Sequence, residues 1–122
     1  MTNQQYIRDE IHKLHAHICG GLADATRIEI LYVLREQPYT VNQIVEALAL
    51  PQPTVSRHLK NLRERGMVKA ERRGQYVYYA LKDQRIIEAL DLLRAVMDDF
   101  LQERARLTQK QQLHSHHKGA LA

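Results

Sequence analysis

Basic side chains are concentrated in one short stretch of the sequence, between positions 52 and 75. Seven Lys or Arg residues and two Glu residues lie there, which gives the stretch a net charge of +5, whereas the whole chain of 122 residues carries +4. The basic residues are Arg57, Lys60, Arg63, Arg65, Lys69, Arg72 and Arg73. Nearly all of the excess positive charge therefore lies in a small part of the chain, and this distribution is typical of a surface that binds a polyanion such as nucleic acid.

A second group of reactive side chains lies near the amino terminus. His12, His15 and Cys19 are three and four residues apart, so on an α-helix they share one side. Two imidazoles and a thiolate are suitable ligands for zinc. Three further histidines near the carboxyl terminus could complete such a site: His114, His116 and His117. The same residues can also be interpreted as ordinary surface histidines and a small apolar cysteine. On this interpretation we expect no cofactor. A metal at His12, His15 and Cys19, and a redox response of Cys19, are the alternatives.

The side chains capable of catalysis are not arranged as an enzyme would need them. Ser56 and His58 are two residues apart on a predicted helix, so they point in different directions, and no acidic group is placed to orient the histidine. The sequence also contains no glycine-rich phosphate-binding loop. We therefore expect that the protein is not an enzyme.

Composition limits the class of protein further. A chain of this length predicts one domain, and its apolar residues form no run near the ~20 residues that a membrane span needs. The first ten residues are already charged and do not have the pattern of a signal peptide. Cys19 is the single cysteine, so an internal disulfide is excluded. These observations predict a cytoplasmic protein with no membrane partner.

Two helices joined by a tight turn are predicted to position the basic side chains. Thr40 and Gln43 form the pattern of a capping box at the start of the first helix. The second helix is predicted from about Gln52 to Arg65, with Gly66 ending it. Its inward stripe consists of Val55, Leu59 and Leu62. The outward face is then polar and basic, which predicts a helix-turn-helix whose second helix meets phosphates and base edges.

A β-hairpin is predicted to follow this second helix. Residues 67–72 and 75–81 are β-prone, and Arg73 and Gly74 lie between them, which predicts a wing with arginines at its tip. The DNA contacts predicted on the helix and the wing are Gln52, Thr54, Ser56, Arg57, Lys60, Asn61, Arg72, Arg73 and Gln75.

Helices at both ends of the chain carry apolar stripes that the small core does not need. The first helix is predicted to end at Gly20 and Gly21, and Asp24 then caps the next helix. The last helix is predicted to begin at Asp83, and its apolar residues alternate in spacings of four and three. We expect both stripes to pair with a second copy of the chain, which makes a homodimer. The predicted interface consists of Ile7, Ile11, Leu14, Ile86, Leu90, Leu93, Met97 and Phe100.

The periodicity of the last helix is lost beyond about Thr108. This change predicts a single DNA-binding and dimerisation domain over residues 1–107, followed by a flexible, His-containing tail over residues 108–122.

Three stretches of the sequence together resemble the ArsR/SmtB family of repressors. They read GLADATRIEILYVLRE, TVNQIVEALALPQPTVSRHLKNLRERGMV and KAERRGQYVYYAL, within residues 20–82. The resemblance implies a mainly α fold with a small β-hairpin, a winged helix-turn-helix of about five helices, and a homodimer built on the first and last helices. It also implies a double-stranded DNA operator that is palindromic and is released when an inducer is sensed. One departure is Pro51, which stands where many relatives have a serine cap.

The family's metal sites are not matched by this sequence. A Cys-x-Cys pair of the third helix is replaced by Val41–Val45, and the last helix offers Asp83 and Asp91 without histidines. The resemblance therefore implies a sequence-specific regulator, a repressor whose inducer does not use these sites. The alternatives are a metal-responsive repressor with terminal His and Cys ligands, an architectural DNA binder of low specificity, and a winged helix that binds a protein.

Overall fold

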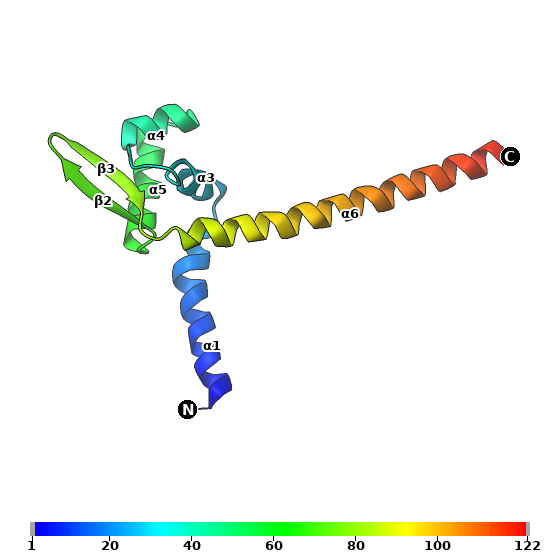
Figure 1. Ribbon diagram of the computed structural model, residues 1–122, viewed down its shortest axis with the longest axis horizontal. Helices are drawn as coiled ribbons and strands as arrows, with labels where there is room; N and C mark the ends of the chain where they lie inside the picture. The colour runs from blue at the N-terminus through cyan, green and yellow to red at the C-terminus, as the bar shows by residue number, and fades with distance from the viewer. Residues whose placement is uncertain (1, 122) are drawn as a thin grey trace. The chain divides into compact units, whose positions relative to one another are not determined.

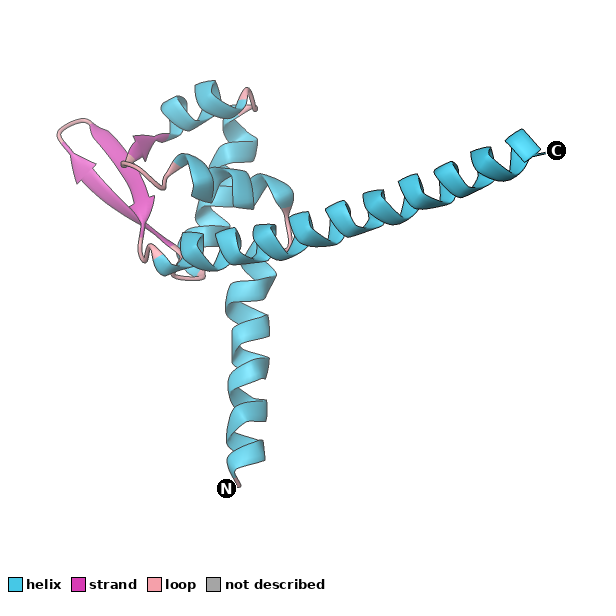
Figure 2. Ribbon diagram, turned by 45° about the vertical axis from the view of Figure 1, so that its right-hand side comes forward, coloured by secondary structure: helices cyan, strands magenta, loops and turns pink. Residues whose placement is uncertain are grey.

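The computed structural model describes the backbone of residues 2–121 and the side chains of residues 2–113. The chain divides into two compact units, Met1–Ile87 and Glu88–Ala122. The elements of the first unit are α1 Asn3–Leu14, the π-helix η1 His15–Cys19, α2 Gly20–Leu22, α3 Ala25–Val33, β1 Tyr39–Thr40, α4 Val41–Leu48, α5 Gln52–Glu64, β2 Val68–Arg73 and β3 Tyr76–Leu81 (Figures 1 and 2). The last helix, α6 Arg85–Leu121, begins in the first unit and makes up the second.

The core of the first unit lies among α3, α4, α5 and the start of β2. Its fully buried side chains are Ile30, Leu31, Leu34, Ile44, Val55, Leu59, Leu62 and Met67. The predicted inward stripe of the helix that begins at Gln52 is thereby confirmed. Both predicted caps are also present: the Asp24 carboxylate accepts from the Thr26 and Arg27 amides, and Thr40 and Gln43 close a capping box.

The hairpin belongs to a three-stranded antiparallel sheet in the order β1-β3-β2. β2 and β3 pair from Val68 opposite Leu81 to Arg73 opposite Tyr76, and Gly74 and Gln75 form the tip. The sequence predicted these two strands but not β1, which has only two residues and pairs Tyr39 with Tyr79. So short a strand has no alternation to reveal it. The β2–β3 hairpin projects away from the helices of the first unit (Figure 2).

The helical path at the amino terminus does not end at Gly20 and Gly21, and the prediction that it does is wrong. The path passes from α1 through η1 into α2 and ends at Leu22. The glycines have another role, because a Cβ at Gly20 would lie 2.6 Å from Nη1 of Arg65, and one at Gly21 would lie 2.8 Å from the Met67 sulfur. They allow close approach of the end of α5 and the residues after it.

α6 continues through the segment that the sequence assigned to a flexible tail. Its backbone is helical to Leu121, so the expected end of the helix near Thr108 is wrong. The division into a domain over residues 1–107 and a tail over 108–122 stays a prediction. No helix among the described residues is both long and apolar enough to cross a membrane.

Candidate nucleic-acid interface

α4 and α5 form the helix-turn-helix, and the turn between them is tight. Ala49 adopts a left-handed conformation with φ of 54°, and the Leu50 amide donates to the Val45 carbonyl at 3.3 Å. Pro51 occupies the N-cap of α5 and supplies no side-chain acceptor, as the sequence predicted. The recognition helix of this motif is therefore α5, set at a fixed angle to α4 by a turn of three residues.

The exposed face of α5 carries side chains that suit DNA. Gln52, Arg57 and Lys60 are exposed, whereas Thr54 and Ser56 are half-buried. Gln52 donates through Nε2 to the Ser56 hydroxyl at 2.8 Å, which orders its amide and leaves Oε1 as an acceptor. Arginine and glutamine are the side chains that most often bond guanine and adenine edges in the major groove.

The wing carries further predicted contacts at its tip. Arg72 and Gln75 are exposed, and Gly74 has a φ of +63° that permits the tight turn. Arg73 lies over the Tyr78 ring at 5.3 Å and bonds Glu71 at 3.4 Å. The charge of Arg73 is thus partly compensated within the hairpin, whereas that of Arg72 faces solvent.

The opposite side of α5 is joined to α3 by a polar network. Arg27 donates to the Gly21 carbonyl at 2.8 Å and to the Gly20 carbonyl at 3.1 Å, and its Nη1 lies 3.4 Å from Nδ1 of the buried His58. Partial burial alone would raise the pKa of Asp24. The amides of Arg27 and Thr26 and the charges of His58 and Arg27 outweigh that effect and hold the pKa below its ordinary value.

Two residues of the basic stretch are bonded inside the protein. Arg65 follows α5 as its C-cap and donates through Nε to Oδ1 of Asn61 at 3.0 Å. Its Nη1 donates to the carbonyls of Ala16 and His17 in η1, at 2.7 and 3.0 Å. The predicted DNA contact of Asn61 thus competes with this bond. The sequence analysis did not predict that Arg65 binds η1. The only signal for this contact was the pair of adjacent glycines, Gly20 and Gly21, in a helical stretch.

The predicted metal ligands are not gathered into a site. Among the side chains that the structure describes, no three His, Cys, Asp or Glu groups lie together so as to hold a metal ion. The shared face of His12, His15 and Cys19 assumed α-helical spacing, but the turn from His15 to Cys19 is π-helical and wider. The remaining candidates, at positions 114, 116 and 117, lie outside the residues whose side chains are described. That the protein needs no cofactor stays a prediction.

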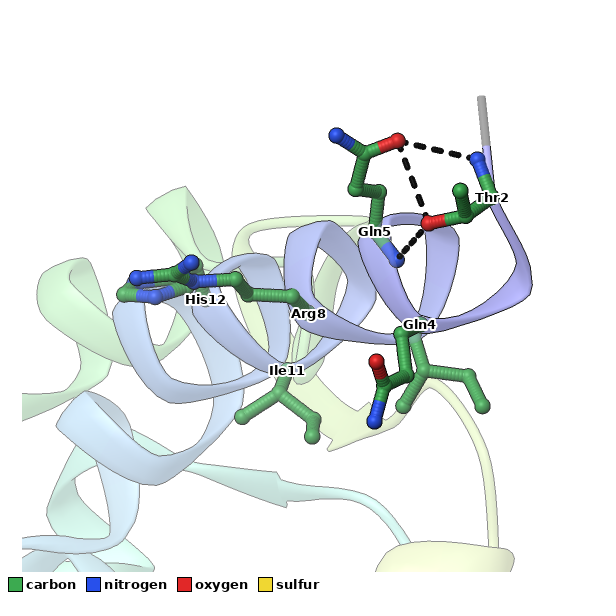
Figure 3. A pocket seen from close by; sticks show the side chains of 7 residues that line it. Thr2, Gln4, Gln5, Arg8, Ile11 and His12 are labelled. Carbon is green, nitrogen blue, oxygen red and sulfur yellow. Dashed lines mark hydrogen bonds between the residues drawn. The ribbon is translucent and has the colours of Figure 1, made fainter.

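The predicted dimer residues differ in their exposure. On α1, Ile7, Ile11 and Leu14 are exposed. Figure 3 shows Ile11 and Gln4 on one side of this helix, with Arg8 and His12 on another and the Thr2–Gln5 capping box at its start. An open hollow of about 620 Å³ lies here; its lining consists of Thr2, Gln4, Gln5, Ile7, Arg8, Ile11 and His12. All of them belong to one helix and its cap, so the hollow is an uncovered helix face.

On α6 the exposed apolar residues are more numerous than the predicted ones. Leu93, Met97 and Phe100 are exposed and Ile86 is half-buried, as an interface residue in a lone chain can be. Leu90 is only 5% exposed in a single chain, so it is less accessible than the other predicted residues of the stripe, and its place in the interface stays a prediction. Helical periodicity alone did not distinguish it from its exposed neighbours. The exposed apolar residues that the sequence did not single out are Leu92, Val96, Leu101, Leu107 and Leu113.

Comparison with known proteins matches this site to a family of regulators. The family model described as "Bacterial regulatory protein, arsR family" matches residues 24–70, which include α3, α4 and α5. The HTH-type transcriptional repressor SmtB of Mycobacterium tuberculosis is 42% identical over 77 residues, 63% of this chain and 57% of SmtB. The HTH-type transcriptional regulator MJ1325 of Methanocaldococcus jannaschii is 36% identical over 85 residues, 69% of this chain and 96% of MJ1325.

A solved structure has the same fold. Rv0081 of M. tuberculosis is 31% identical, with a TM-score of 0.70, and the match covers 78% of this chain and 96% of Rv0081. The chain spans little more than half the length of SmtB, whereas it spans nearly all of MJ1325 and Rv0081. The predicted winged helix-turn-helix is confirmed, and the relatives are named as regulators of transcription, as the sequence led us to expect.

Proposed function

Since this chain belongs to the arsR family of bacterial regulatory proteins, we propose that it is a cytoplasmic transcriptional repressor that binds a palindromic DNA operator as a homodimer. The observation that supports this most strongly is the composition of the exposed face of α5. Gln52, Arg57 and Lys60 are exposed there, next to a half-buried Ser56, on a helix whose other face is fully buried. A helix that bound a protein would present apolar anchors at these positions.

The wing extends this surface with a different kind of contact. Arg72 and Gln75 lie at the tip of a hairpin that projects from the first unit, where a backbone phosphate or a minor groove can be reached. In this proposal α5 reads the sequence in the major groove and the wing positions the protein on the duplex.

The dimer follows from the apolar faces that a single chain leaves uncovered. α1 exposes Ile7, Ile11 and Leu14, and α6 exposes Leu93, Met97 and Phe100. A stripe of large exposed apolar side chains along a helix is rare on a monomer and marks an interaction site. A second copy presents the same faces, so a two-fold dimer covers both, and its two α5 helices then require an operator with two related half-sites.

The inducer in this proposal does not act through the metal positions that the family resemblance implies. The stretch Val41–Val45, where the family resemblance would place the two cysteines, contains no cysteine. The carboxylate of Asp83 is held by the Arg85 guanidinium at 2.7 Å. A metal at Asp83 would have to displace that ion pair without an imidazole beside it. The signal is therefore of another kind, or a metal bound elsewhere.

Selection of binding sites from random duplexes tests the proposal. We expect a selected sequence with two-fold related halves, which purified protein retains in competition with bulk genomic DNA at about 0.15 M salt. Arg57→Ala should lose this preference, whereas Lys13→Ala, which removes an exposed charge from α1, should keep it. If bulk genomic DNA instead displaces the protein from the selected site, the protein is an architectural binder. A promoter that carries the selected site should be silenced by the protein in cells.

A further inference from the structure

One guanidinium joins two segments that are almost fifty residues apart in the sequence. Arg65 lies at the C-terminal end of α5, and its Nη1 donates to the Ala16 and His17 carbonyls at 2.7 and 3.0 Å. Its Nε donates to Asn61 within α5 at 3.0 Å, so the fork is held on the recognition helix while its outer nitrogen reaches η1. A guanidinium has its donors in one fixed plane, and a lysine could not make both sets of bonds.

The π-helical turn changes the backbone bonding around the carbonyl that Arg65 binds. In a regular α-helix the Gly20 amide would bond the Ala16 carbonyl, four residues earlier. In η1 the Gly20 amide bonds the His15 carbonyl, five residues earlier. The Ala16 carbonyl therefore does not accept from the Gly20 amide, and the shortest bond of Arg65 is made to that carbonyl.

Glycine at position 20 creates the space for the guanidinium. A Cβ built there would lie 2.6 Å from Nη1 of Arg65 and 3.2 and 3.3 Å from Cζ and Nη2. These are the outer atoms of a flexible side chain, so an alanine at position 20 would displace the guanidinium without forcing the backbone apart. Arg27 binds the next carbonyls of the same path, those of Gly20 and Gly21, from α3.

We propose that Arg65 is a positioning residue that couples the π-helical turn η1 to the recognition helix, so that the N-terminal helix sets the orientation of α5 on DNA. The part that concerns DNA rests on the proposed function. Arg65 holds η1 through the Ala16 and His17 carbonyls, so the path of η1 and the position of the end of α5 are linked by these two bonds. Any event on α1 that shifts the two carbonyls then changes the hold on the end of α5.

Substitutions of Arg65 separate this role from an ordinary contact to DNA. The proposed role of Arg65 depends on the planar geometry of its guanidinium. Arg65→Lys and Arg65→Gln should therefore both weaken binding to the selected operator, by about 5- to 10-fold. Neither should change the salt dependence of binding, because no phosphate contact is lost. Arg72→Gln on the wing is the matched loss of a charge that contacts DNA in the proposed function, and it should reduce the salt dependence.

Gly20→Ala tests the same link without changing Arg65. It should weaken operator binding about as much as Arg65→Gln, and the double variant should be no weaker than either single one, because both remove the same bonds. Thermal unfolding of each variant checks that the fold is retained. The single cysteine, Cys19, is exposed and lies in η1, so a nitroxide attached there reports on the order of the turn without DNA. Its mobility should rise in Arg65→Gln and Gly20→Ala and stay unchanged in Lys13→Gln.

The coupling is overturned if the nitroxide at Cys19 is equally mobile in wild type and both variants, or if Arg65→Lys binds the operator like wild type. Rescue by lysine together with a lower salt dependence in Arg65→Gln would assign Arg65 to a phosphate contact instead. A wild-type protein that selects no DNA sequence would contradict the proposed function, whereas the nitroxide at Cys19 would still decide whether Arg65 holds η1.

Discussion

Nη1 of Arg27 lies 3.4 Å from Nδ1 of His58, and this contact joins α3 to the buried side of the recognition helix. A guanidinium can only donate, so this contact is a hydrogen bond in the His58 tautomer whose Nδ1 carries no proton. The other nitrogens of Arg27 hold the Gly20 and Gly21 carbonyls. Three elements of the first unit therefore meet at one side chain.

Replacing Arg27 should destabilise the first unit. Arg27→Met leaves two carbonyls and a buried imidazole without their charged donor, so the free energy of unfolding should fall by about 2–4 kcal/mol. Urea titration measures it. Arg35→Met is the control, since the exposed Arg35 side chain lies over the Tyr32 ring and pairs with Glu36 at the surface; its effect should stay within about 0.5 kcal/mol. Equal effects of the two substitutions would contradict the network.

Residues of α5 and of the wing should differ in what their loss does to DNA binding. Arg57→Ala and Lys60→Ala should weaken the selected operator by about 1–3 kcal/mol and relax its sequence preference. Arg72→Ala should weaken all sequences evenly and lower the salt slope by about one. Arg73→Ala should have a smaller effect, because Glu71 and Tyr78 already engage its guanidinium. Filter binding or anisotropy at several salt concentrations distinguishes these outcomes; an operator bound equally well by all four variants would refute the docking.

Two leucines three residues apart on α6 should separate dimer formation from folding. Leu93 is 61% exposed in one chain, so Leu93→Asp should give a folded monomer in sedimentation, because the second copy would bury an unpaired charge. Leu90 is 5% exposed, so Leu90→Ala should instead lower the free energy of unfolding by about 2–4 kcal/mol. A wild-type monomer at micromolar concentration would remove the argument for a palindromic operator.

The start of α6 should make stability depend on pH in the acid range. Hydrogen bonds from the Arg85 guanidinium, and then from its backbone amide, lower the pKa of Asp83 to about 2 from an ordinary value of 3.8. A carboxyl group whose pKa is lower in the folded state stabilises it above the unfolded pKa, and this contribution is lost as the pH falls from about 4 to about 2. Wild type should therefore exceed Asp83→Asn in unfolding free energy at pH 5 but not at pH 2. When Arg85→Gln is introduced into both proteins, the difference in unfolding free energy between them at pH 5 should become smaller.

Metals and oxidants should separate the sensing hypotheses. We expect zinc, nickel, cobalt, cadmium and arsenite to leave the operator complex intact, because the family positions lack their ligands. If a metal does release it, the effect should vanish in Cys19→Ser and in a variant with alanine at His12 and His15, and it should weaken as the pH drops. Release by peroxide in metal-free buffer that Cys19→Ser abolishes would identify a thiol sensor. Metal release that survives all these substitutions would place the ligands elsewhere.

Local patterns made the recognition unit predictable, whereas contacts between distant segments did not show in the sequence. Asp24 and Thr40 cap helices through amides two or three residues away, so the letters alone reveal them. The bonds of Arg65 to η1 cross 48 and 49 positions and depend on a π-helical turn, for which composition gives no rule. The low exposure of Leu90 was not predictable for a similar reason, because helical spacing shows that a residue is apolar on a given face but not how exposed that face is.

The separation between Arg65 and Ala16 also bears on how the chain folds. The core of the first unit is built from helices that follow one another closely, so it can form from local contacts. α1 contributes no buried residue to the single chain, and the π-helical turn that follows it is held by Arg65, from 48 and 49 positions further along the sequence. We therefore expect α1 to have low local stability in a single chain, with amide protons that exchange well before those of α5. In the proposed dimer, association with a second copy would complete the folding of this segment, and protomer concentration would set how long its amides stay protected.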